Sequence, residues 1–321
     1  MSTPQIDVVM PVYNAEAFVA EAVISILRQS FSDFRLICID DGSTDRSSEI
    51  LDGLAADDDR LQIVRQENQG LVGALNAGLS VCTAPLIARM DADDIAMPDR
   101  FALQVRYLEA HSDVIAVGTA ILEMDSDTDP LGIERFATDH EHIDGAMLRL
   151  KTGMAHPSVM MRREAVQSAG GYRVDFEWVE DIDLWLRMAE TGRLANLPEV
   201  LLCYRQHTSS GTWSVGRSRR ERTLALIEEA YARRGLAFPD ELAKKCGKTR
   251  SSGGPAKWAR KAARQGQWNV ANKHLRRQWK DSPVSLLTWR MTLEVAFRSA
   301  VTRLIKGRPE FPEIPRYRDA A

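Results

Sequence analysis

The sequence predicts an α/β fold in which a mostly parallel sheet is flanked by helices, with a helical extension at the C-terminal end. Through the first hundred residues, short apolar runs alternate with longer segments whose apolar residues recur at helical spacing. This alternation is typical of parallel sheets with crossover helices. Polar residues also collect just after the predicted strands, at the edge where such sheets bind ligands.

The individual elements follow from these patterns. Gly192 ends a helix that begins near Asp181, and Gly266 turns a helical hairpin over 255–283. The predicted strands are 6–10, 35–40, 61–65, 85–90 and 114–124, followed by a strand and loop over 194–207. The other predicted helices are 15–29, 45–55, 71–80, 98–110, 217–235 and 285–305.

Charge divides the chain of 321 residues into an acidic body and a basic tail. Residues 1–215 carry 17 Lys and Arg against 35 Asp and Glu, whereas residues 216–321 carry 25 against 10. The net charge of −3 is therefore the sum of −18 for residues 1–215 and +15 for residues 216–321. A basic tail of this kind favours an anionic surface as its partner.

The four cysteines, Cys38, Cys82, Cys203 and Cys246, lie far apart and show no CxxC spacing. Buried thiols in a reduced, cytoplasmic protein are therefore expected. The first residues have no charged leader before an apolar core, so no signal peptide is predicted. No uncharged apolar stretch reaches the length of a spanning helix.

The segment MDADD at 90–94 is the candidate metal site. Two carboxylates that flank one residue at the end of a strand can bind Mn²⁺ or Mg²⁺ through oxygen, and the cation can bridge two phosphates. The alternative is a solvated loop that caps the next helix. Because the motif follows an apolar strand, we favour Asp91 and Asp93 as metal ligands.

The segment IDDGSTD at 39–45 is a candidate for reading a nucleobase. A carboxylate just past a buried strand can accept the N–H of uracil or guanine. The alternative is a turn built on Gly42, with the next side chains capping a helix. We expect Asp41 to face the ligand, Asp45 to cap the helix and Asp40 to be structural.

The segment WVEDIDLWLRM at 178–188 offers carboxylates for proton abstraction. Glu180 and Asp181 stand at a predicted helix start, where the helix dipole favours the charged form. Helix capping by one of them is the alternative role. Trp178 and Trp185 flank the pair and could form an apolar wall for a sugar ring.

Three further polar residues lie near strand ends. His207 is a candidate third metal ligand or pyrophosphate contact, and Arg205 could face a phosphate. His156 is a weaker candidate for a phosphate or acceptor contact. The alternatives are a structural role for either histidine and a surface ion pair for Arg205.

Taken together, these motifs resemble glycosyltransferase family 2, whose members have the Rossmann-like GT-A fold. The matching blocks cover about residues 6–212 in the family's order. They are PVYNAEAFVAEAVISILRQSFSDFRLICIDDGSTD, NQGLVGALNAGL, MDADDIAMPDRF, HPSVMMRRE, GGY and EDIDLWLRM. The resemblance implies a catalytic domain over 1–212, with a nucleotide-binding half at 1–97 and an acceptor half at 98–212. Residues 213–321 form the basic helical extension.

The resemblance also implies roles for particular residues. Asp93 becomes the direct metal ligand and Asp91 its partner in the DxD pair. Asp181 becomes the base of an inverting displacement, with Glu180 as the fallback. The residues implied to line the nucleotide, with uridine favoured over guanosine or deoxythymidine, are Pro11, Tyr13, Asn14, Asp41, Asn68 and Asp91.

The sequence departs from the family pattern in two places. Leu71 and Val72 stand where many members have small or basic residues, and YRQH replaces a QxxRW-type block. We therefore expect transfer of single sugars from a nucleotide-sugar donor to a glycan or lipid-linked acceptor, in cell-surface polysaccharide or lipopolysaccharide assembly. The alternatives are a sugar-nucleotide pyrophosphorylase and an inactive sugar-nucleotide-binding or scaffold protein. We expect no nucleic-acid partner, and the oligomeric state stays open.

The last predicted helix carries an apolar stripe at three- and four-residue steps. Arg290, Glu294 and Arg298 lie on a neighbouring face. The stripe favours peripheral binding at the inner face of an anionic membrane. The alternative is packing on the body or on a partner subunit. The stripe consists of Leu286, Trp289, Leu293, Phe297, Ala300 and Leu304.

Overall fold

The first half of the sheet is parallel, as the sequence predicts. In the computed structural model, which describes residues 3–207, 217–242, 254–283, 285–305 and 311–317, four strands run in the order β3-β2-β1-β4. The strands are β1 (Ile6–Val12), β2 (Phe34–Asp40), β3 (Leu61–Arg65) and β4 (Leu86–Arg89). The crossover helices are α1 (Val19–Leu27), α2 (Ser47–Asp57) and α3 (Gly70–Val81).

The second half of the sheet is mixed. The order continues as β4-β8-β6-β9-β5, with β7 paired to β6. Only the β6–β9 pair is parallel in this half. The strands are β5 (Ile95–Ala96), β6 (Val114–Asp125), β7 (Pro130–Glu134), β8 (Met160–Arg162) and β9 (Arg193–Gln206).

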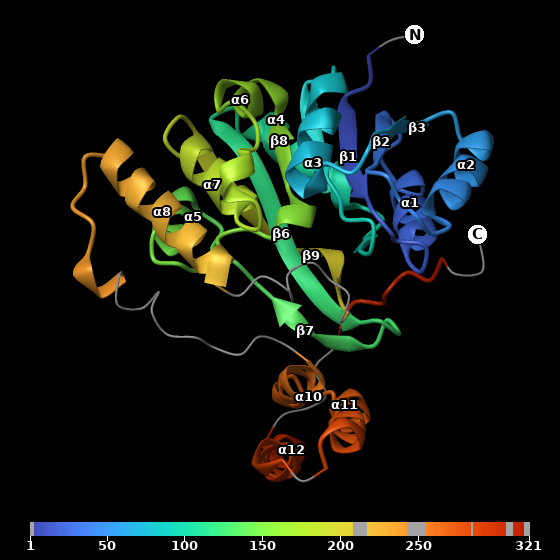
Figure 1. Ribbon diagram of the computed structural model, residues 1–321, viewed down its shortest axis with the longest axis vertical. Helices are drawn as coiled ribbons and strands as arrows, with labels where there is room; N and C mark the ends of the chain where they lie inside the picture. Colours follow the sequence, from blue (N-terminus) through green and yellow to red (C-terminus); the bar gives the residue numbers. More distant parts are fainter. Residues whose placement is uncertain (1–2, 208–216, 243–253, 284, 306–310, 318–321) are drawn as a thin grey trace.

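Helices cover both faces of the sheet (Figure 1). Because side chains alternate along a strand, Val8 and Met10 of β1 enter one core while Val9 enters the other. The first core contains α1, α2 and α4 (Arg100–Ala110). The second contains α3, α5 (His140–Met147), α6 (Arg163–Ser168), α7 (Glu180–Met188) and α8 (Arg217–Arg233). Two short 3-10 helices, η1 (His156–Ser158) and η2 (Val174–Phe176), complete this side.

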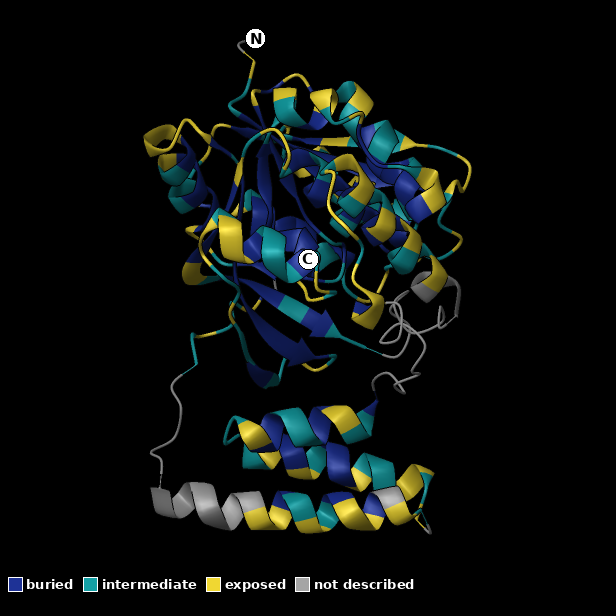
Figure 2. Cartoon of the chain, turned by 90° about the vertical axis from the view of Figure 1, so that its left-hand side faces the viewer, coloured by how far each residue is buried: buried dark blue, intermediate teal, exposed yellow. Residues whose placement is uncertain are grey.

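Three C-terminal helices form a separate bundle with its own core: α10 (Pro255–Arg264), α11 (Trp268–Asp281) and α12 (Leu286–Ile305). Gly266, with φ of 75°, turns α10 into α11 as predicted. Figure 2 shows this bundle, here called the helical unit, below the body, with α12 farthest from it. The preceding helix α8 packs instead on α7 and η2 of the body.

The helical unit docks on the acidic hairpin β6–β7. Leu131 of β7 belongs to the apolar core of the unit. Lys261 pairs with Glu123 and, at 3.1 Å, with Glu134. Lys273 lies 2.6 Å from Asp125. Part of the basic charge of the tail is therefore neutralised by the body of the same chain.

Beyond the helical unit the chain returns to the body. Residues 311–317, here called the strap, pack Phe311, Ile314 and Tyr317 on the side chains of α1, β5 and β6. The guanidinium of Arg28 lies 5.9 Å from the centre of the Tyr317 ring. None of the helices in the described part of the chain combines the length and apolarity needed to cross a bilayer. Cys38, Cys82 and Cys203 are buried free thiols, and Cys246 lies outside the described residues.

Candidate active site at the carboxyl edge of the sheet

The site residues from the first half of the chain lie at the carboxyl ends of three parallel strands. Asn14 follows β1, Asp41 follows β2 and Asp91 follows β4. The strands β2, β1 and β4 are neighbours, with β1 in the middle. Their carboxyl ends meet at one edge, which is where a parallel sheet presents ligand-binding loops.

The two aspartates after β2 have different partners. Asp40 accepts hydrogen bonds from the backbone N–H of Ser43, at 3.0 Å, and from the hydroxyl of Ser48, so it holds the turn. Asp41 is buried and accepts from Gln66 Nε2 at 2.7 Å and from the backbone N–H of Gln69 at 2.8 Å. Asp41 therefore ties the end of β2 to the loop before α3.

The loop after β1 is held against the same turn. Asn14, with φ of 50°, accepts the backbone N–H of Thr44 on Oδ1 at 2.8 Å. Tyr13 beside it is 53% exposed, and Pro11 in β1 is half-buried. Tyr13 thus offers a free aromatic face next to Asp41's turn.

Asn68 is exposed in the loop before α3. A Cβ on Gly42 would lie 2.9 Å from the backbone nitrogen of Asn68, and Gly42 has φ of 73°. Glycine is therefore required here both for its backbone conformation and for the close approach of the two loops. Asp45 accepts the backbone N–H of Ser47 at 2.9 Å, at the start of α2, although the N-cap residue of this helix is Arg46 rather than Asp45.

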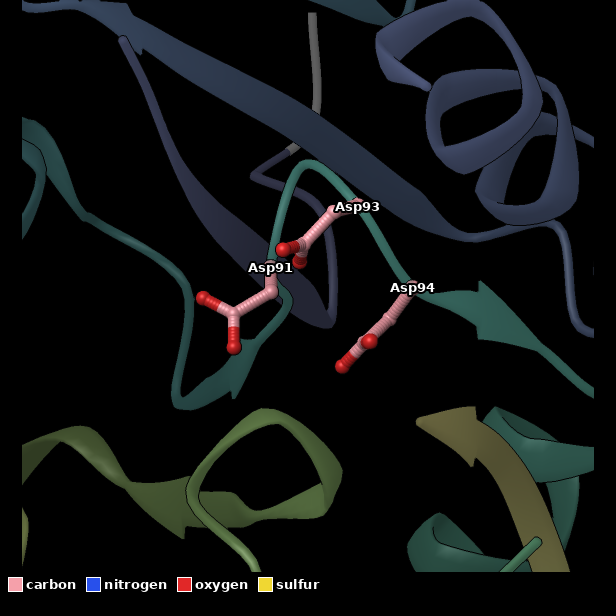
Figure 3. Close-up of side chains that lie close together, drawn as sticks. All are labelled: Asp91, Asp93 and Asp94. Atoms are coloured by element: carbon pink, nitrogen blue, oxygen red, sulfur yellow. The ribbon is translucent and has the colours of Figure 1, made fainter. Parts of the chain in front are cut away.

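The acidic loop between β4 and β5 brings together Asp91, Asp93 and Asp94 (Figure 3). One carboxylate oxygen from each lies within 4.8 Å of the others. Burial and the neighbouring carboxylates raise the pKa of Asp94 well above its ordinary value. Oδ2 of Asp94 is buried and has no hydrogen-bond partner among the described residues. This set of oxygens suits a divalent cation such as Mn²⁺ or Mg²⁺.

Two residues at the end of β9 contact the acidic loop: Arg205, within the strand, and His207, just after it. Arg205 Nε donates to the backbone oxygen of Asp93 at 2.7 Å, and Nη2 lies 2.8 Å from Glu21 Oε2 in α1. The Arg205 side chain is fully buried, so it lies beneath the loop rather than at its surface. His207 Nε2 lies 2.8 Å from Asp93 Oδ2 and is the more accessible of the two.

Sequence reasoning missed Arg89, the last residue of β4. Its buried guanidinium forms an ion pair with Asp91 and lies within electrostatic reach of Glu180. Its Nε and Nη1 have no hydrogen-bond partner in the described part of the chain. A charged residue inside the apolar run PLIARM was the available signal, because arginine is almost never fully buried without a partner.

Glu180 and Asp181 form the first turn of α7. Glu180 is buried, and burial together with the nearby charge of Asp181 raises the pKa of Glu180 to about 7. Asp181 is half-buried. The pKa of Asp91 is raised mainly by burial, and the charges of Asp93 and, to a smaller extent, Asp181 act in the same direction. The helix N-cap is Val179, which makes no side-chain cap hydrogen bond, but Asp181 Oδ1 accepts the backbone N–H of Ile182 in the first turn at 2.8 Å.

The aromatic and histidine candidates near α7 differ in accessibility. Trp185 is buried in the second core, with its ring 5.8 Å from that of His156. His156 is also buried, and its Nε2 lies 2.8 Å from the Tyr172 hydroxyl. Burial lowers the pKa of His156 well below its ordinary value, so the ring is neutral. Trp178 is half-buried and has φ of 74°, which is strained for a bulky residue.

A cavity of about 670 Å³ opens beside the acidic loop, between the body and the helical unit. Phe18 and His207 line it on the body side, with their ring centres 5.0 Å apart. Trp258, Arg277 and Lys280 line it on the side of the helical unit. The site therefore adjoins a mixed apolar and basic cleft.

The chain is similar in sequence to known glycosyltransferases. EpsE of Bacillus subtilis is 36% identical over 214 residues, covering 65% of this chain and 76% of EpsE. The amylovoran biosynthesis glycosyltransferase AmsE of Erwinia amylovora is 35% identical over 199 residues, covering 61% of this chain and 74% of AmsE.

Solved structures show the same fold at low sequence identity. TarS 1–349 of S. aureus in complex with UDP-GlcNAc matches with a TM-score of 0.60 at 13% identity, covering 95% of this chain and 93% of that one. The mannosyltransferase PcManGT of Pyrobaculum calidifontis, in complex with GDP-Man and Mn²⁺, matches with a TM-score of 0.53 at 18% identity, covering 95% and 88%. The family profile described as Glycosyl transferase family 2 matches residues 7–170. The chain therefore belongs to glycosyl transferase family 2 and has the GT-A fold.

Proposed function

We propose that the chain transfers a single sugar from a nucleotide-diphosphate donor to an acceptor hydroxyl, with inversion at the anomeric carbon. The observation that carries the proposal is the placement of three carboxylates after β4, between Asp41 after β2 and the acids of α7. A donor needs a base contact, charge neutralisation at the diphosphate and a proton acceptor at the other end. Asp41 would supply the base contact, the carboxylates after β4 would neutralise the diphosphate through a metal, and an acid of α7 would accept the proton.

The nucleotide would lie over the loops after β1 and β2. The exposed Tyr13 ring can stack on the base, and the carboxylate of Asp41 can accept a base N–H. Asn14 and Asn68 border the same turn, and Pro11 precedes it. We favour a uridine donor, which agrees with the UDP-GlcNAc bound by TarS, although the PcManGT complex contains GDP-Man.

Asp93 and Asp91 would hold Mn²⁺ or Mg²⁺, with His207 or Asp94 as a further ligand. When bound, the metal acts as a Lewis acid on the departing diphosphate. The protein prepares for this by holding Asp93 through Arg205 and Asp94 through the backbone N–H of Arg205, at 2.8 Å. The acidic loop is thereby fixed before any ligand arrives.

Asp181 would remove the proton from the acceptor hydroxyl as the bond from sugar to phosphate breaks. Asp181 is the more accessible of the two acids, whereas Glu180 is buried with a pKa raised to about 7. Trp178 stands next to the pair and offers an apolar contact for a sugar ring. Trp185 is buried in the core and is not offered to a ligand.

The acceptor would be a glycan or a lipid-linked glycan in cell-surface polysaccharide assembly, at the cytoplasmic side of the membrane. The biosynthetic roles in the names of AmsE and of the O-antigen enzyme WbnJ of Escherichia coli support this assignment. The catalytic domain would comprise residues 1–212, with the contacts of α8 on α7 adding that helix to it. The helical unit would serve a separate role.

A thermal-shift screen of nucleotide sugars with and without Mn²⁺ tests the proposal. A donor at about 100 times its Kd should add about 2.7 kcal/mol to the free energy of unfolding. This shift should require the metal and should vanish in Asp93→Ala. Equal stabilisation by a UDP-sugar with and without Mn²⁺ in the wild type would refute the metal assignment.

A further inference from the structure

The outer face of α12 exposes large apolar side chains that the described part of the chain leaves uncovered. The side chains of Leu286, Trp289, Leu293 and Phe297 are 88%, 55%, 70% and 72% exposed. Their spacing of three, four and four residues places them on one face of the helix. Figure 2 shows α12 on the side of the helical unit that faces away from the body. The side chains of Ala300 and Leu304, which continue the stripe, lie outside the described part.

The fold of the helical unit does not require this outer face. A different set of residues, Thr288, Met291 and Val295, is buried against α10 and α11. Helix α12 therefore has two apolar faces, although the unit uses only one of them. The predicted alternative, in which the stripe packs on the body, is wrong for the four described side chains. An exposed apolar face of this size on an otherwise polar helix is typical of an interaction surface.

Basic side chains border the exposed stripe. Arg290 is exposed and lies one turn from Leu286 and from Leu293, on the same face. The rings of Trp279 and Trp289 are 4.7 Å apart, so the end of α11 lies beside the stripe. Arg276, exposed and one turn before Trp279 on α11, forms no ion pair with any described residue. The stripe is thus flanked by positive charge.

We propose that this face binds an anionic lipid bilayer, with α12 lying in the interface. Apolar side chains on one face with arginine and lysine at its border is the pattern of an interfacial amphipathic helix. Anionic lipids attract arginine and lysine, and each such residue near the surface raises the membrane affinity roughly fivefold. Binding to a second copy through the same face would bury the exposed Arg290 of both copies, and burying an unpaired charge opposes association. The bilayer is therefore the better match in charge.

Sedimentation of the full chain with vesicles tests the proposal without donor or acceptor, so its outcome is independent of the proposed activity. The protein should pellet with vesicles of phosphatidylcholine plus phosphatidylglycerol and not with phosphatidylcholine alone. Raising the salt from about 0.1 M to about 1 M shortens the Debye length from about 10 Å to about 3 Å and should release the protein. Leu293→Ser with Phe297→Ser should lower the vesicle affinity at least about tenfold.

Matched variants separate this surface from general effects of charge and apolarity. Arg276→Gln with Arg290→Gln should weaken vesicle binding by more than about tenfold, whereas Arg106→Gln, at an exposed position of α4, should not. Leu236→Ser removes an apolar side chain that is 51% exposed on the body and should have no effect. Sedimentation that is equal for wild type and Leu293→Ser with Phe297→Ser overturns the proposal. So does a stable dimer that this double variant dissociates, because the face would then bind a second copy.

Discussion

Arg89 occupies a buried position at the end of β4, directly below the candidate metal ligands. It forms an ion pair with Asp91, and its charge also lowers the pKa of Glu180 against the larger effect of burial. The positive charge of Arg89 favours the ionised form of the carboxylates near it, so part of the acidic cluster stays ionised in the absence of metal. Asp94, by contrast, forms no ion pair among the described residues. Burial and the charges of Asp93 and Asp91 raise its pKa against the smaller lowering effects of the Arg205 N–H and of Arg89.

At the same scale, the two acids of α7 can be told apart by substitution. Asp181→Asn should lower turnover by about 10² to 10⁴ while leaving UDP affinity close to normal, because a positioned base acts only on the acceptor proton. Steady-state kinetics and UDP titration measure the two effects. If Asp181→Asn turned over normally and Glu180→Gln were inactive, the base would be Glu180 instead.

The raised pKa of Glu180 makes stability depend on pH. In the unfolded chain a glutamate has a pKa of about 4.3, and in the fold the pKa of Glu180 is about 7, so folding favours its protonated form. The stabilisation is fully present below about pH 4 and is lost as the pH rises through 7. Glu180→Gln removes this loss. Relative to wild type, the variant should gain about 2–3 kcal/mol between pH 5 and pH 8, since each pKa unit is worth about 1.4 kcal/mol.

Chemical denaturation of metal-free protein at several pH values measures this gain. Glu109→Gln, at an exposed position of α4, is the matched control and should show no such trend. A Glu180→Gln variant whose stability follows that of wild type at every pH would mean that Glu180 is ionised in the fold.

At the scale of elements, the sequence predicted the long helices and strands and missed the short strands. β1 to β4 and their helices have strong periodicity, and each appears within a few residues of its predicted bounds. β5 has two residues and β8 three, too few for any period, and both depend on pairing with distant strands. The mixed half of the sheet could not be predicted for this reason. Burial of Trp185 and Arg205 was equally invisible, because it depends on packing between distant segments.

The strap over 311–317 is another element that the sequence did not reveal. Tyr317 is buried against Ile24, Ile95 and Leu122 of the body, so the strap completes a core that begins in α1. Tyr317→Ala should lower the free energy of unfolding by about 2–4 kcal/mol, the usual cost of deleting a buried aromatic ring. Tyr13→Ala, which removes the same ring from an exposed position, should cost less than about 0.5 kcal/mol. Urea denaturation compares the two, and equal losses would mean that the strap does not stabilise the body.

At the scale of the whole molecule, the division into an acidic body and a basic tail has a structural counterpart. The acids of the β6–β7 hairpin face Lys261, Lys273 and Arg277 of the helical unit. The basic residues on the docked side of the helical unit are thus paired with acids of the body. Among the described residues, the basic ones beside the exposed stripe of α12 are not paired with the body. In this arrangement the docking contacts fix the direction in which the exposed stripe of α12 points relative to the active site.

Among the docking residues, Asp125 is the one whose substitution should weaken the contact between the hairpin and the helical unit most. It is fully buried, with Lys273 at 2.6 Å and His274 Nε2 at 2.9 Å. Although burial alone would raise its pKa, the close contacts with His274 and Lys273 hold the pKa of Asp125 well below its ordinary value. Docking should therefore be intact at neutral pH and weaken only as the pH falls below about 4.

Asp125→Asn removes the fully buried carboxylate of this cluster, although Lys273 keeps its ion pairs with Asp127 and Asp129. The loss should cost about 1.5–3 kcal/mol and free the helical unit to move away from the hairpin. Small-angle X-ray scattering at neutral pH should then report a larger radius of gyration than for wild type. Asp127→Asn is the matched control, because Asp127 is half exposed and contacts Arg277 at 2.9 Å and Lys273 at 2.8 Å. An exposed pair contributes about 1 kcal/mol or less, so this variant should scatter like wild type. Unchanged scattering from Asp125→Asn would show that the apolar contact of Leu131 with the helical unit holds the two parts together without the buried pair.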